Sequence, residues 1–110
     1  MRAADKIPAN FRLSKRAVAK LVELKTEAEG ATNRSMVPAL FWDEDYNEIK
    51  REHEVLGVAT GWYYLDEVPP KLLQEVDGVT LIFAVTAKEA QHFLGKEIDH
   101  QDEHRFFLAP

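Results

Sequence analysis

Apolar residues recur every three or four positions in the first third of the chain, after a short lead that contains Pro8. The charged residues between them fill the opposite side, which is the pattern of an amphipathic helix. Ser14 is placed to cap the start of this helix and Gly30 its end. A brief strand over residues 11–13 precedes it. The apolar positions are Ala17, Val18, Leu21, Leu24 and Ala28.

Two longer apolar segments follow, both of strand type. Residues 36–42 form a short run in which Pro38 predicts an edge strand or a bulge, because proline cannot donate a hydrogen bond to a neighbouring strand. The polar residues 43–54 predict an exposed connection with a helical turn near 46–50. Residues 55–68 then resume strand character, and Gly57 and Gly61 predict a bend or bulge there.

The C-terminal third begins with the turn dipeptide Asp77-Gly78. Residues 79–85 are apolar at almost every position, which predicts a strand buried on both faces. Thr86 and Glu89 have the spacing of a capping box and open a short helix. Short strands over residues 97–100 and 105–108 complete the chain. The short helix is expected to end at Gly95 and to bury one face, formed by Ala87, Ala90, Phe93 and Leu94.

This order of elements predicts one α+β domain over residues 1–110, mainly β, a compact barrel-like or sandwich fold with two short-to-medium helices packed outside. The composition, 45% hydrophobic and 30% charged, is typical of a globular protein. A net charge of −5 argues against nucleic acid as a partner. Because we find neither a signal-peptide pattern nor a membrane-length apolar run, we expect a cytoplasmic protein without a membrane partner.

Cysteine is absent from the sequence. Disulfides, thiolate nucleophiles, cysteine-ligated zinc and conventional iron–sulfur clusters are therefore all excluded. The usual signatures of hydrolases, nucleotide-binding loops and zinc peptidases are missing too. We therefore expect a protein that is not an enzyme.

The C-terminal third resembles the HesB-like domain of A-type iron–sulfur carriers. The matching pieces are the Asp77-Gly78 turn, the strand and helix over residues 79–94, the Leu94-Gly95 and Ile98-Asp99 pairs, and the closing segment 106–110. The first half matches only in the order of its elements. The resemblance implies a mixed, mainly β fold and, in the family, a role in carrying iron or an iron–sulfur cluster.

That family role depends on three cysteines, one in a glycine-rich loop and two in a terminal cysteine-glycine-cysteine motif. The loop position falls near Asp43 or at Ala59 in this chain, and the sequence given ends at Pro110 without the terminal pair. No family cysteine can be carried over. The resemblance therefore implies the fold of a carrier without its cluster ligands.

The segment 98–104, IDHQDEH, is the densest group of metal-ligating residue types. In a hairpin, His100 and His104 would flank the turn, and with Asp99 they would offer nitrogen and oxygen ligands suited to zinc or iron. Apart from such a possible zinc or iron ion, no cofactor is expected. A solvated polar turn is the ordinary alternative, and Asp99 could also serve the turn by accepting backbone N–H groups. The acidic run 43–45 similarly predicts a solvated connection rather than a calcium or magnesium site.

Aromatic residues cluster at Trp62, Tyr63 and Tyr64. A strand directs Tyr63 to the face opposite Trp62 and Tyr64, so one set is expected to be buried and the other exposed. Phe41 and Trp42 are expected on a neighbouring strand. Exposed tyrosine or tryptophan beside acidic residues favours a protein-binding surface. The sequence therefore predicts a cysteine-less HesB-like domain that binds a protein or, alternatively, a metal; another candidate is an acidic protein that neutralises a basic partner.

Overall fold

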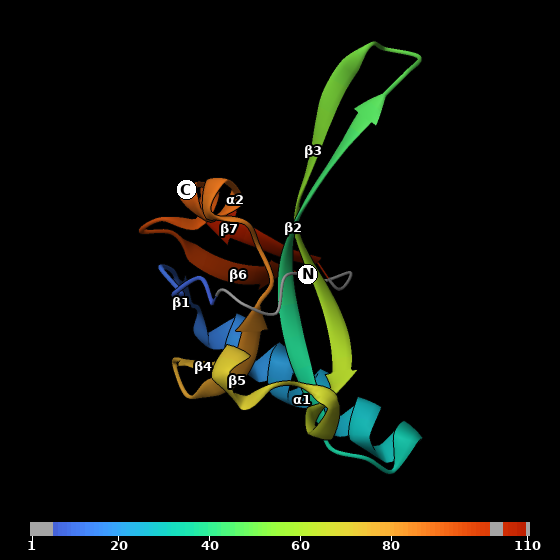
Figure 1. Cartoon of the computed structure of the whole chain (residues 1–110), viewed down its shortest axis with the longest axis vertical. Helices are drawn as coiled ribbons and strands as arrows, with labels where there is room; N and C mark the ends of the chain where they lie inside the picture. The colour runs from blue at the N-terminus through green and yellow to red at the C-terminus, as the bar shows by residue number, and fades with distance from the viewer. Residues whose placement is uncertain (1–5, 102–104, 110) are drawn as a thin grey trace.

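Two β-sheets and two α-helices make up the fold in residues 6–101 and 105–109, the residues that this computed structural model describes (Figure 1). The predicted α+β class, mainly β with helices outside, is confirmed. Neither sheet closes into a barrel within the described residues. The helices are α1 (Lys15–Thr32) and α2 (Ala87–Ala90), and the short 3-10 turns are η1 (Leu65–Glu67), η2 (Pro70–Leu72) and η3 (Gln91–Phe93).

The larger sheet has the strand order β3-β2-β5-β4, and the smaller has the order β1-β6-β7. In the larger sheet, β2 runs antiparallel to β3 and parallel to β5. In the smaller sheet, β1 pairs in parallel with β6, which joins the two ends of the chain. The strands are β1 (Arg12–Leu13), β2 (Met36–Asn47), β3 (Glu52–Tyr64), β4 (Leu73–Val76), β5 (Val79–Phe83), β6 (Glu97–Gln101) and β7 (Arg105–Ala109).

Helix α1 begins where the sequence predicts but ends later. The Ser14 hydroxyl caps it by accepting the N–H of Ala17, as expected. The predicted C-terminal cap at Gly30 is wrong, because the helix continues to Thr32. Asn33 takes the left-handed conformation instead (φ 55°) and donates its N–H to the Glu29 carbonyl. Asparagine tolerates this conformation better than most residues, so glycine is not required.

The polar segment 43–54 is not the predicted connection with a helical turn. It forms the distal half of a β2–β3 hairpin, whose pairing runs out to Asn47 and Glu52. Figure 1 shows this half extending beyond the rest of the molecule, where strands need no buried apolar face. The pairing register shifts between Asp43 and Glu44, opposite Gly57. Gly57 has a φ of 90°, so the predicted bulge is confirmed at this glycine.

Pro38 lies in a central strand, not in the predicted edge strand. Strand β2 is hydrogen-bonded on both sides, to β3 and to β5. Pro38 is tolerated because the ladder with β5 involves only the next two residues, Ala39 and Leu40. Its missing N–H therefore removes no bond from that ladder.

Strand β5 is buried on both faces of the larger sheet, as its sequence predicts. Leu81 and Phe83 belong to the main core with helix α1, whereas Ile82 belongs to a second cluster on the opposite face. That second cluster also contains Val37 and Ala39 of β2. We call the face that carries Val37, Ala39 and Ile82 the outer face of the sheet.

The short helix keeps its predicted start and loses half of its predicted buried face. Thr86 and Glu89 form the expected capping box. Ala90 and Phe93 are buried, but Ala87 and Leu94 are exposed. The α-helical part ends at Ala90, and the next residues form a 3-10 turn with a tighter period. This change of period turns Leu94 out of the core.

Candidate functional site

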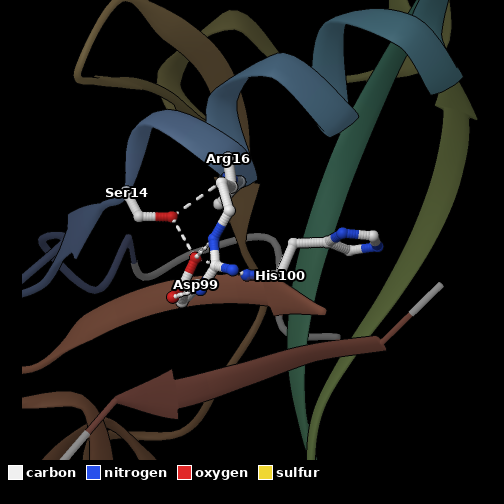
Figure 2. A network of polar contacts seen from close by, with 5 residues as sticks. Ser14, Arg16, Asp99 and His100 are labelled. Carbon is white, nitrogen blue, oxygen red and sulfur yellow. Dashed lines mark hydrogen bonds and ion pairs between the residues drawn. The ribbon is translucent and has the colours of Figure 1, made fainter. Parts of the chain in front are cut away.

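Asp99 links strand β6 to the start of helix α1. Its carboxylate accepts hydrogen bonds from the Ser14 hydroxyl at 2.6 Å and from the Arg16 guanidinium through Nε, at 3.1 Å, and Nη2. Figure 2 shows Arg16 and Ser14 converging on this carboxylate. Ser14 is also the cap of α1, so one hydroxyl bridges the Asp99 carboxylate and the Ala17 N–H. The network fixes the start of the helix against the smaller sheet.

The same network favours the ionised form of Asp99. The Arg16 guanidinium, the Ser14 hydroxyl and the backbone N–H of His100 hold the pKa of the Asp99 carboxyl well below its usual range. The backbone nitrogen of His100 lies 2.8 Å from the carboxylate oxygen Oδ1, to which it donates. Asp99 thus accepts the N–H of the next residue in β6, whereas the turn that it was predicted to serve lies outside the described residues.

His100 points away from Asp99 (Figure 2), because neighbouring residues on a strand face opposite sides. Its imidazole packs against the Phe106 ring, with centroids 4.9 Å apart. His104, the third residue of the predicted metal site, lies outside the described residues. A metal held by His100 would therefore take no ligand from Asp99 in this arrangement, and the site stays a prediction.

Among the described residues, no three histidine or carboxylate side chains converge in a way that could hold a metal ion. Asp43 and Glu44 of the acidic run are exposed on β2. The side chain of the third member, Asp45, lies outside the description.

The Trp62 to Tyr64 cluster divides between the two faces of the sheet, as predicted. Tyr63 pairs with Val37 and is 45% exposed on the outer face. Its ring lies 6.5 Å from that of Phe41, which is half-buried on the paired strand. Trp62 and Tyr64 face the other side and are half-buried. Tyr63 and Phe41 therefore form the accessible aromatic pair.

Glycine makes the approach of Phe41 possible. A Cβ placed on Gly61 would lie 3.0 Å from Cε2 of the Phe41 ring. Since this is closer than side chains normally pack, the missing side chain at residue 61 lets the ring lie across β3. Gly61 was expected to interrupt the strand, and it instead supports the aromatic pair.

Two other aromatic residues of these strands, Tyr64 and Trp42, pack against a charged group and an aromatic ring. The Arg34 guanidinium lies 3.5 Å from the centre of the Tyr64 ring and also contacts Asp66. Trp42 stacks on His92, with ring centroids 4.3 Å apart and planes inclined by 9°. The Trp42 indole N–H is buried and has no acceptor among the described residues. These contacts fix Tyr64 and Trp42, in contrast to the accessible Tyr63.

Arg16 was not singled out from the sequence, although it carried a signal. It lies in the first turn of a helix, where the macrodipole disfavours a positive charge. A nearby carboxylate offsets this cost for Arg16. The partner, Asp99, is 83 residues away, and no local pattern could identify it.

No helix among the described residues has both the length and the apolar character needed to cross a bilayer. No protein-family model matches the chain, and no curated protein is detectably similar to it. The fold is similar to the solution NMR structure of a protein from Aquifex aeolicus, structural genomics target QR6, with a TM-score of 0.53 and 18% identity. The match covers 100% of this chain and 99% of that one. At this identity the likeness shows a shared fold alone.

Proposed function

We propose that this chain is a HesB-like domain without cluster chemistry, and that it acts as a non-catalytic protein-binding module. The family part is supported by the order of elements after the Asp77-Gly78 turn, which is β5, α2, β6 and β7. The absence of cysteine leaves such a domain without the thiolates that hold a cluster. Its role then depends on its surface.

The observation that carries the binding part is the exposure of Tyr63 beside Phe41. Tyrosine offers a large, rigid contact area together with a hydroxyl, and aromatic residues are enriched where binding energy concentrates. Tyr63 lies on the outer face of the sheet, next to the apolar cluster of Val37 and Ala39. Val37 and Ala39 are themselves buried, so the surface offered to a partner here is that of Tyr63 and the half-buried Phe41.

The experiment replaces Tyr63 by photo-reactive benzoylphenylalanine in the full chain and irradiates the protein in an extract of its source cells. The matched control carries the same group at Val22, which is 54% exposed on α1. We expect a discrete cross-linked product from position 63 that the control lacks. Excess parent protein should suppress this product, and excess Tyr63→Ser protein should not. Identical products from both positions, or none, would contradict the proposal.

The net charge of −5 favours a basic protein as the partner, as it would in a protein that neutralises a basic target. Asp66 and Glu67, both well exposed, follow Tyr63 within η1 and share the single Arg34 guanidinium, so the three side chains together keep a net negative charge. Opposite charge speeds the encounter of two proteins and is screened by salt. Cross-linking that falls steeply between low and high salt would identify such a partner, and cross-linking insensitive to salt would exclude it.

A further inference from the structure

A cavity of about 560 Å³ lies at the C-terminal end of β5, and residues from both faces of the larger sheet line it, Phe41 among them. Pockets of about 300–1,000 Å³ are the usual size for small-molecule sites. Segments that are far apart in the sequence form its walls. They include Ile7 of the lead, Phe41 of β2, Leu72 of η2, Ile82 of β5, and Ala84 and Ala87 on either side of Thr86.

The wall of this cavity is mainly apolar. Ile82 and Leu72 are buried apolar residues, and no polar side chain is buried among the described residues. Two backbone N–H groups of the wall are already used, because Ala84 donates to the Leu40 carbonyl and Leu72 to the Pro69 carbonyl. A ligand that fills the cavity must therefore have an apolar body.

The rim carries two charged side chains, the Glu89 carboxylate and the Lys6 ammonium, and only Lys6 has no hydrogen-bond partner among the described residues. Thr86 and Glu89 satisfy each other, since the Thr86 hydroxyl accepts the Glu89 N–H and the Glu89 carboxylate accepts the Thr86 N–H. Lys6 is exposed at the rim, and no ion pair involves it within the described part of the chain. Its ammonium group is therefore placed to receive an anion.

We propose that this cavity binds an amphipathic carboxylic acid, with its apolar tail against Phe41, Ile82 and Ala84 and its carboxylate beside Lys6. A mainly apolar wall with one cation at the rim fits a ligand that is apolar except at one anionic end, since the Glu89 carboxylate at the same rim is already bonded to Thr86. This inference does not rest on the protein-binding proposal, although Phe41 belongs to both surfaces.

Calorimetric titration of the full chain with octanoate, decanoate and dodecanoate tests the proposal. We expect saturable one-to-one binding, with Kd falling about fourfold for each added methylene, until the cavity is full. Decanol, which has a similar tail without the charge, should bind more weakly than decanoate. These probes also separate the fatty acid from a general preference for apolar molecules.

Variants locate the site. Ala84→Phe fills the cavity and should abolish decanoate binding, and Ala87→Phe, at an exposed position of the wall, should do the same with less risk to folding. Circular dichroism confirms that both remain folded. Lys6→Gln should raise the Kd by about two- to fivefold, the effect of an exposed ion pair. Lys96→Gln, which removes another exposed lysine outside the wall, should leave the Kd unchanged.

Several results would overturn the proposal. These are no decanoate binding, binding that survives both phenylalanine variants, and decanol that binds as tightly as decanoate. If decanoate fails to bind and Ala84→Phe instead removes the cross-link formed at Tyr63, the cavity belongs to a protein interface. If decanoate binds and position 63 gives no specific cross-link, the cavity inference stands while the protein-binding proposal fails.

Discussion

Replacing Phe93 by alanine should remove a large part of the stability of the fold. Phe93 is fully buried, and its ring lies 4.9 Å from Phe83, 5.6 Å from Trp42 and 5.7 Å from Phe11 between centroids. Truncation of a buried phenylalanine typically costs about 3–5 kcal/mol. Because ring contacts add about 0.5–1.5 kcal/mol each, we place Phe93→Ala in the upper half of that range. Domains of this size have a total stability of about 5–15 kcal/mol.

Urea denaturation followed by circular dichroism measures this effect, and the matching shift in melting temperature is about 15–20 °C. The neighbouring substitution Leu94→Ala is the control, since Leu94 is 61% exposed. We expect it to change the free energy of unfolding by less than about 0.5 kcal/mol. Phe93 and Leu94 were predicted to share one buried helix face, so this pair of variants tests the change from α-helix to 3-10 turn after Ala90. Equal losses in the two variants, or a loss below about 1 kcal/mol for Phe93→Ala, would refute the reasoning.

Three further predictions concern backbone conformation, capping and charge. Gly30→Ala should raise the free energy of unfolding by about 0.5–1 kcal/mol, because residue 30 lies inside α1 with no atom within 4 Å of the added Cβ. Gly78→Ala should lower the free energy of unfolding by about 1–2 kcal/mol, because Gly78 has a φ of 84°. Thermal denaturation in which both glycine variants are stabilised, or both destabilised, would contradict this pair of predictions. Thr86→Ala should cost about 1 kcal/mol in urea denaturation through loss of the capping box, and no measurable loss would show that this cap is dispensable. The pKa of Asp99 is lower in the folded than in the unfolded chain, so the free energy of unfolding should fall as the pH drops below about 4. The variant Asp99→Asn should lose less stability than the parent when denaturation is measured between about pH 5 and pH 2.5. If both proteins show the same dependence on pH, Asp99 does not contribute to the acid response.

Features that depend on a few adjacent residues could be predicted from the sequence. The Ser14 cap, the Thr86 and Glu89 capping box and the Asp77-Gly78 turn all formed as expected. Each is decided by hydrogen bonds or dihedral angles within about four residues, which local sequence specifies. The alternation of Tyr63 against its neighbours follows equally from strand geometry.

Features that depend on distant partners could not be predicted in the same way. The polar residues of the distal hairpin resemble a loop by composition, yet backbone pairing with the opposite strand holds them extended. Pro38 suggests an edge strand unless one knows that β5 pairs only with the two residues after it. The contact of Asp99 with Arg16 joins opposite ends of the chain. In each case the interaction that decides the structure is made with residues that are distant in the sequence.

The pairing of β1 with β6 also determines when the fold can be completed during synthesis. Strand β1 and the Ser14 cap are among the first residues made, but the Ser14 hydroxyl bonds to a carboxylate 85 residues later. Until β6 has emerged from the ribosome, the start of α1 lacks both its neighbouring strand and the Asp99 anchor. The β2–β3 hairpin, by contrast, pairs residues that are close in sequence and can form much earlier. Between the synthesis of β3 and the emergence of β6, the nascent chain can therefore carry a paired hairpin and an unanchored helix, and chaperones or proteases would meet it in that interval.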